Sequence, residues 1–135
     1  GVRRIMPVRM ERCERESFRL RDDRLARITL EAAKQSARSW IPEIGETATI
    51  NEVCARPGFI IAAIPGSRGT IREAVAQAGK RGNVTVIVGP EGDFSPEEVA
   101  CMTEHGAMPV SLGGLILRSE TAAAVAVALV CDALR

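Results

Sequence analysis

The chain has 135 residues, of which 46% are hydrophobic, and a net charge of +1 at pH 7. This composition suits one domain with its own core and excludes charge-driven disorder. With only three Phe and one Trp, the apolar content is mainly aliphatic, which favours buried parallel strands covered by helices over an aromatic-rich β-sandwich.

Charge is distributed unevenly along the chain. Residues 1–40 hold eleven Lys and Arg against six Asp and Glu, whereas residues 41–135 hold seven against eleven. An arginine-rich segment of this kind can face nucleic-acid phosphates, but its interleaved acidic residues equally fit a solvated helix face. Because the chain opens on Gly1 and enters a structured-looking segment directly, we expect an upstream part to precede it.

The first half of the chain predicts a helix, a strand and a second helix. Good helix formers over residues 25–37 place Ile28, Ala32 and Gln35 near one face, and residues 39–42 end this helix. The continuous apolar run at 58–64, closed by Pro and Gly, is typical of a buried strand. A glycine-containing loop then leads into a helix over 70–78.

The second half repeats the alternation of strand and helix. Residues 84–88 are almost wholly β-branched and predict a strand. Ser95, Pro96 and Glu98 then supply an N-cap, a first-turn proline and a capping-box glutamate for the next helix. A short strand at 108–112 and a long small-residue helix at 119–134 follow. This order predicts an α/β fold with a mostly parallel sheet flanked by helices.

The four cysteines, Cys13, Cys54, Cys101 and Cys131, are far apart and form no CxxC pair. With His105 as the only histidine, a zinc site has too few ligands at workable spacing, so we expect no metal. Isolated cysteines suit a reducing cytoplasm, and one histidine makes a histidine-dependent hydrolase improbable. His105 precedes Gly106, which fits the end of a helix.

Each predicted strand ends in a glycine-bearing loop: Ile64-Pro65-Gly66, then Gly89-Pro90-Glu91-Gly92, then Leu112-Gly113-Gly114. In parallel α/β sheets, ligands bind beyond the carboxyl ends of the strands. The three loops predict a pocket formed largely by main-chain atoms, although glycines in tight turns are the plainer explanation of any one loop. Neither GxxxxGK[ST] nor GxGxxG is present, which argues against a triphosphate or dinucleotide site.

Four stretches then identify a family. VIVGPEGDFSPEEV (86–99) resembles the IGPEGGFS-x-x-E signature of the RsmE family, and SLGGLILRSETAAAVAVAL (111–129) resembles its LG-x-x-ILRTETA motif. EAAKQSARSWIPEI (31–44) and GVRRIMPVRMERC (1–13) resemble two further elements of the same family, in the same order. The resemblance covers nearly the whole chain.

The resemblance implies a knotted methyltransferase domain of the SPOUT class. Such proteins bind S-adenosylmethionine in a trefoil knot, usually dimerise through the knot helices, and methylate N3 of a uridine in small-subunit (16S) ribosomal RNA. Residues 1–135 would form this domain, without its first strand and helix and without the family's N-terminal PUA-like domain. Methylation of another RNA position, a non-catalytic RNA-binding or ribosome-assembly module, and an anion-binding regulatory domain remain alternatives.

Site residues follow by position in the motifs. Arg118 would contact the target uridine or its phosphate, unless it only pairs with Glu120, and Glu120 would accept a proton unless it is merely a charge at a helix N-terminus. RNA contacts would come from Arg12, Gln35, Ser36 and Arg38, unless Gln35 and Ser36 only satisfy backbone groups on a packed helix. Cofactor contacts would come from Ile64, Pro65, Gly89, Pro90, Glu91, Gly92, Leu112, Gly113, Ile116, Leu117 and Thr121. Core packing explains Ile116 and Leu117 equally well.

Three residues depart from the family pattern. Asp93 stands where the family often has Gly, Leu115 where Arg is common, and Ser119 where Thr is usual. The first would add a charge near the cofactor, and the second would remove a possible phosphate contact.

Overall fold

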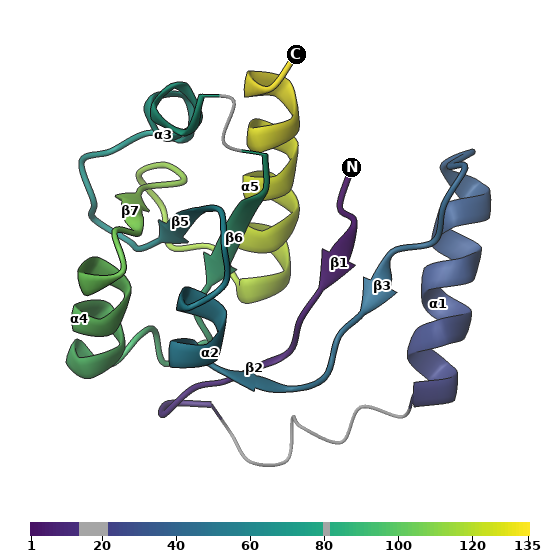
Figure 1. Cartoon of the computed structure of the whole chain (residues 1–135), viewed down its shortest axis with the longest axis horizontal. Helices are drawn as coiled ribbons and strands as arrows, with labels where there is room; N and C mark the ends of the chain where they lie inside the picture. The colour runs from purple at the N-terminus through teal and green to yellow at the C-terminus, as the bar shows by residue number, and fades with distance from the viewer. Residues whose placement is uncertain (14–21, 80–81) are drawn as a thin grey trace.

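The computed structural model describes residues 1–13, 22–79 and 82–135, so Arg15, Arg19 and Arg21 of the arginine-rich segment lie outside the described residues. Figure 1 shows the arrangement of the elements. In chain order these are β1 (Arg4–Ile5), β2 (Val8–Arg9), α1 (Asp22–Gln35), β3 (Glu43–Ile44), β4 (Ala48–Thr49), α2 (Ile50–Cys54), β5 (Phe59–Ala63), α3 (Ile71–Ala78), β6 (Val84–Val88), α4 (Pro96–Glu104), β7 (Met108–Val110) and α5 (Ser119–Ala133).

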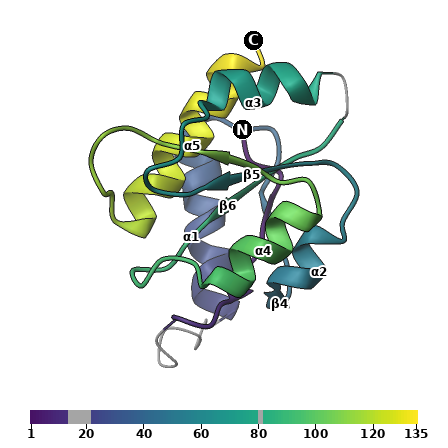
Figure 2. The same ribbon diagram turned by 90° about the vertical axis from the view of Figure 1, so that its left-hand side faces the viewer.

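A three-stranded parallel sheet of order β6-β5-β7 forms the centre of the molecule. Figure 2 shows α3 and α5 on one side of this sheet and α2 and α4 on the other. Every residue of the central strand β5 is buried, as expected for a strand covered on both faces. The expected α/β class with a parallel sheet is therefore confirmed.

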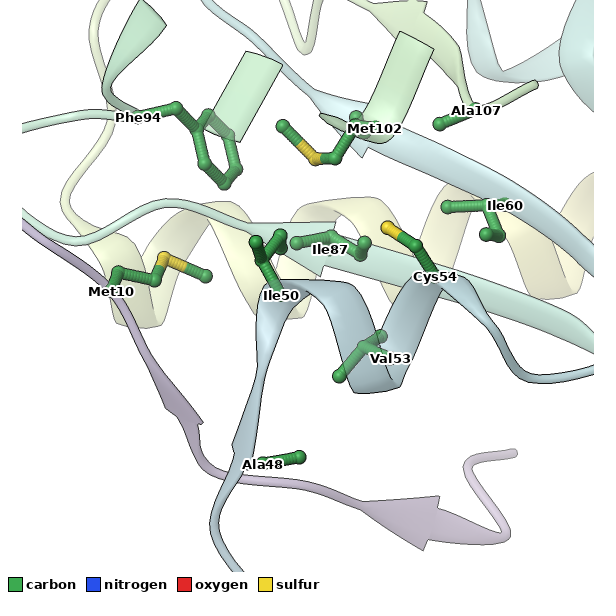
Figure 3. Close-up of a cluster of buried hydrophobic side chains, with 11 residues drawn as sticks. Met10, Ala48, Ile50, Val53, Cys54, Ile60, Ile87, Phe94, Met102 and Ala107 are labelled. Carbon is green, nitrogen blue, oxygen red and sulfur yellow. The ribbon is translucent and has the colours of Figure 1, made fainter. Parts of the chain in front are cut away.

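The core has two halves because successive side chains of β5 point to opposite faces. Ile60 and Ala62 pack with α2 and α4, together with Phe94 and Met102. Figure 3 shows this half of the core, which Met10 of the N-terminal segment also enters. Phe59 and Ile61 point the other way and pack with α3, β7 and α5.

The four N-terminal strands are two residues each, and they pair in parallel as β1 with β3 and β2 with β4. Helix α1 lies beside them at the far edge of the molecule from α4 (Figure 1). The face of α1 expected from Ile28, Ala32 and Gln35 is exposed, and Thr29 and Ala33 are the buried positions instead. Alanines on several sides of this helix left the sequence without a single apolar stripe.

Reciprocal capping boxes begin three helices. The predicted box of α4 is present, with Ser95 at the N-cap, Pro96 in the first turn and Glu98 bonded back to the cap. Thr70 and Glu73 form the same arrangement at α3, as do Thr49 and Glu52 at α2. Each box satisfies backbone N–H groups that a helix start leaves unpaired.

The helix boundaries in the structure lie within two residues of the predicted ones, except that α1 begins at Asp22 and not at residue 25. His105 is the C-cap of α4, followed by Gly106 at φ 73°, so its predicted place at the end of a helix is confirmed. Helix α1 ends earlier than the 39–42 segment because Ala37 turns the chain at φ 50°. None of the helices in the described ranges is long and apolar enough to cross a membrane.

Candidate functional site

The carboxyl ends of the three central strands lie side by side. In the register of the sheet, Ala63 is opposite both Val88 and Val110. The N–H of Ile64 then donates to the carbonyl of Val110 at 2.9 Å. The three glycine-bearing loops predicted from the sequence therefore leave the sheet from one edge, namely the β5–α3 loop (residues 64–70), the β6–α4 loop (residues 89–95) and the β7–α5 loop (residues 111–118).

The β6–α4 loop is shaped by a turn. The N–H of Asp93 donates to the carbonyl of Pro90 at 2.9 Å, and Glu91 and Gly92 at the tip are exposed. Asp93 has φ 59°, in the left-handed region that glycine adopts most readily and that Asp tolerates better than most residues. Glycine would adopt this conformation without strain.

The Asp93 carboxylate is used within the loop. Its Oδ1 accepts the N–H of Phe94 at 2.8 Å, and Phe94 is buried in the core beside Gly89. The charge expected near the cofactor therefore stabilises the turn of the β6–α4 loop.

Gly92 is required by a close approach of the N-terminal segment. A Cβ at position 92 would lie 2.9 Å from the Cβ of Arg12 and 3.1 Å from its carbonyl oxygen. The Arg12 guanidinium donates to the Gly92 carbonyl at 3.1 Å. The structure thus places Arg12, expected to contact RNA, directly against the β6–α4 loop.

The start of the β7–α5 loop is held by hydrogen bonds, whereas its middle is exposed to solvent. The Ser111 hydroxyl bonds to both the N–H and the carbonyl of Gly113, which has φ 136° and accommodates this tight turn. Beyond it, the exposed fractions of Leu115 and Ile116 are 82% and 87%, while Leu117 is half-buried. Core packing is therefore excluded as the role of Ile116 in this chain.

The start of α5 is held against the β6–α4 loop. The hydroxyl of Ser119 donates to the carbonyl of Gly89 at 3.0 Å. Arg118 is the N-cap of α5 and is exposed, and Glu120 and Thr121 are exposed in the first turn. Within the described parts of the chain, Arg118 forms no ion pair with Glu120.

The remaining RNA candidates lie at the end of α1, away from these loops (Figure 1). The Ser36 hydroxyl donates to the carbonyl of Ala32 at 2.7 Å, a local backbone contact. Arg38 donates to the carbonyl of Val2 at 3.3 Å and stacks over Trp40, with 5.2 Å to the ring centroid. Gln35 is exposed. Arg12 is thus the one of these four residues that the structure brings to the strand ends.

Two contacts at this edge were not anticipated from the sequence. Glu98, recognised only as a capping residue, also accepts the N–H of Glu11 at 2.8 Å through its second carboxylate oxygen. Ser119, noted only as a replacement for Thr, bonds to Gly89. Both are contacts between distant segments, and the only sequence signal was that each residue lies within a family-like motif.

Hydrogen bonding also affects ionisation next to the β5–α3 loop. Backbone and side-chain hydrogen bonds from Thr70 hold the pKa of the Glu73 carboxyl below its usual value. A negative Glu73 favours the start of α3, where the helix dipole is positive.

The sequence matches a known protein family. Residues 1–131 match the model of the RNA methyltransferase domain family. The chain belongs to this family. The resemblance found in the motifs is confirmed by curated relatives that carry the name ribosomal RNA small subunit methyltransferase E.

Those relatives are longer than this chain. The Mycobacterium bovis protein is 36% identical over 107 residues, which cover 73% of this chain and 40% of the relative. The Rickettsia conorii protein is 29% identical over 135 residues, covering 96% of this chain and 54% of the relative. The chain thus spans about half the length of the relatives it matches, or less.

Solved structures agree over nearly the whole chain. A Legionella pneumophila methyltransferase in complex with S-adenosylmethionine has a TM-score of 0.85 and 31% identity, covering 98% of this chain and 56% of that one. The Neisseria gonorrhoeae ribosomal RNA small subunit methyltransferase E, also bound to S-adenosylmethionine, has a TM-score of 0.76 and 29% identity, covering 94% and 54%.

Proposed function

We propose that this chain is the S-adenosylmethionine-binding domain of a ribosomal RNA methyltransferase. The observation that carries the proposal is the alignment of three glycine-bearing loops at one sheet edge, in a domain of the RNA methyltransferase family. The names of the relatives and the cofactor bound in two solved structures support it.

The loop residues fit the chemistry of this cofactor. An adenine ring needs flat apolar contacts and main-chain hydrogen bonds at its edge. Leu112, Gly113, Ile116 and Leu117 supply main-chain groups together with an exposed apolar side chain, and Ile64 and Pro65 border them at the end of β5. The β6–α4 loop residues Gly89, Pro90, Glu91 and Gly92 would form the other wall, with Thr121 beside it at the start of α5.

The substrate we propose is N3 of a uridine in small-subunit ribosomal RNA. S-adenosylmethionine would supply a methyl group made electrophilic by its sulfonium. The chain's own task is then to align the base and favour loss of the imide proton. Arg118 is exposed beside the loops and would contact the target base or its phosphate, while Glu120, one turn into α5, would accept the proton or leave Arg118 to stabilise the anion.

We also propose a trefoil knot and a homodimer for this domain. The Ser119–Gly89 bond and the bond from the N–H of Ser111 to the carbonyl of Gly69 tie the last segment to two earlier loops, which supports threading. Leu129 and Leu134 leave α5 with exposed apolar side chains that a second copy would cover. We place the protein in the cytoplasm, where its proposed substrate is made.

Two measurements test the proposal. Calorimetry with S-adenosylmethionine and S-adenosylhomocysteine should show saturable binding of both. Methylation of small ribosomal subunits by the full gene product, with nucleotide mapping by mass spectrometry, should give N3-methyluridine. Arg118→Ala should keep cofactor affinity within a few-fold and abolish transfer.

The outcomes separate the alternatives. Cofactor binding with a different modified nucleotide would favour another RNA position. RNA binding without cofactor binding, in a folded sample, would favour a non-catalytic assembly module. Unchanged turnover in Arg118→Ala would remove Arg118 from the site.

A further inference from the structure

Three soft donor groups meet on the side of the molecule where α2 packs against α4. The sulfur atoms of Cys54 and Cys101 and a ring nitrogen of His105 all lie within 4.8 Å of one another. Nothing in the sequence indicated this cluster, because Cys54 is the last residue of α2, whereas Cys101 lies in α4 and His105 is the C-cap of that helix four residues later. Residues four apart in a helix share a face, and here that face meets the end of α2.

The spacing is close to that of a tetrahedral metal site. With zinc–sulfur bonds of about 2.3 Å and zinc–nitrogen bonds of about 2.1 Å, the ligand atoms of a tetrahedral zinc lie roughly 3.5–3.8 Å apart. Cys101 Sγ and His105 Nδ1 are 3.9 Å apart, close to this spacing, and no pair of ligand atoms needs to approach by more than about 1.3 Å. Two thiolates and an imidazole form a donor set that soft cations prefer over Mg²⁺ or Ca²⁺.

The three side chains differ in burial, so a cation would approach them from the exposed His105 side. Cys54 is buried among the residues of Figure 3, where it projects from α2 toward α4. Cys101 is half-buried and its thiol donates to the amide oxygen of Asn51, also on α2. His105 is exposed at the C-cap of α4, so its ring turns without disturbing the core.

We propose that Cys54, Cys101 and His105 bind one thiophilic divalent cation, for which Zn²⁺ is the natural probe. Binding replaces two S–H bonds with two metal–sulfur bonds and releases both protons to solvent. The His105 ring gives up its 2.9 Å contact with the carbonyl of Cys101, and the Asn51 amide turns its NH₂ group toward the new thiolate. Water takes the fourth position.

The proposed ion would join α2 to α4 at the end of α4 opposite the candidate functional site. The nine residues of α4 span about 14 Å at 1.5 Å per residue, so the ion lies away from the loops at the sheet edge. Its role would be to brace these helices against each other. This inference is therefore independent of the proposed function, and its variants should leave cofactor binding unchanged.

Metal titration of the reduced chain tests the site. The 135-residue chain, without a histidine tag, is stripped with a chelator, desalted and kept reduced with a phosphine. Zn²⁺ is then titrated by calorimetry, and Co²⁺ by absorption spectroscopy. We expect one ion per chain, thiolate-to-cobalt charge-transfer absorption, and a thermal midpoint that rises with Zn²⁺ concentration.

Variants decide whether these residues hold the ion. Cys101→Ser alters a half-buried side chain at the margin of the core and His105→Gln an exposed one, and each should weaken binding more than tenfold. Cys131→Ser, which removes a half-buried cysteine of α5 outside the cluster, is the matched control and should bind like the parent. Absence of binding by the folded parent, or equal affinity in Cys101→Ser and the parent, would overturn the proposal.

Discussion

The carboxylate of Glu98 accepts the backbone N–H of Glu11 at 2.8 Å, across 87 positions of sequence. Its other oxygen accepts the N–H of Ser95 at 2.9 Å, closing the capping box of α4. Glu98 is buried, at 7% exposure. One side chain thus begins a helix and fixes the N-terminal segment where Arg12 meets the β6–α4 loop.

Replacing Glu98 with Gln should separate these two roles from simple packing. The amide keeps the shape but has only one oxygen, so its NH₂ group must face one of the two backbone N–H donors. We expect the free energy of unfolding to fall by about 1–3 kcal/mol, as for a buried donor left without its hydrogen-bond partner. Urea unfolding measures this loss, and hydrogen exchange at the Glu11 amide should become faster.

Glu97→Gln is the control for this prediction. Glu97 lies next to Glu98 in the first turn of α4, carries the same charge and is exposed. Its replacement should change stability by no more than about 0.5 kcal/mol. Equal losses in the two variants would mean that Glu98 acts only through helix-dipole charge.

The conformation of Asp93 gives a second prediction. At φ 59°, a β-branched side chain is strained, whereas glycine is not. The free energy of unfolding of Asp93→Gly should therefore stay within about 1 kcal/mol of the parent value, because relief of strain offsets the lost bond to Phe94. Asp93→Val should destabilise by about 2 kcal/mol or more.

Glu91→Val serves as the comparison for Asp93→Val. It places the same side chain in the same loop, at an exposed position without positive φ. Thermal unfolding of the three variants checks the order. If both valine variants lose the same stability, backbone strain at position 93 is not the cause.

A third prediction concerns acid. Hydrogen bonds from Thr70 lower the pKa of Glu73 below its ordinary value of 4.5. A lowered folded-state pKa contributes stability above the unfolded value, and this contribution is lost as the pH falls through the folded value. The stability advantage of the parent over Glu73→Gln should therefore be full at pH 6 and shrink below pH 4.5. Urea midpoints followed by circular dichroism measure it, and an advantage that stays constant down to pH 3 would contradict the assignment.

Much of the central fold could be predicted because its signals are local. The strand Val84–Val88 has the predicted bounds, as β-branched residues leave few other conformations. The spacing of Ser95 and Glu98 is typical of the capping box at a helix start. The convergence of the three loops followed from the rule for parallel sheets and is confirmed by the register.

The N-terminal half was predicted less well. Strands β1 to β4 are two residues long, too short for an alternating pattern, and helix α2 has only five residues, so none was expected. The cluster of Cys54, Cys101 and His105 and the Glu98–Glu11 contact depend on which helices pack together. Such contacts between distant segments leave no spacing in the sequence to detect.

The end of α1 supplies a last prediction. Ala37 follows the helix at φ 50°, where the N–H of Arg38 donates to the carbonyl of Ala33 at 3.0 Å and that of Ala37 to Lys34 at 3.1 Å. This pair of bonds is a Schellman motif, whose left-handed residue is usually glycine. Alanine is strained there, so Ala37→Gly should raise the free energy of unfolding by about 0.5–1 kcal/mol.

The same substitution at Ala32 should have the opposite sign. Ala32 is exposed in the interior of α1, where glycine costs about 1 kcal/mol relative to alanine. Both substitutions remove one methyl group. Urea unfolding of the two variants at 25 °C compares their effects on stability. Opposite signs at these two positions, five residues apart, would establish that the left-handed conformation of Ala37 terminates α1. A loss of stability in both variants would mean that the Ala37 methyl group makes a contact that outweighs the strain.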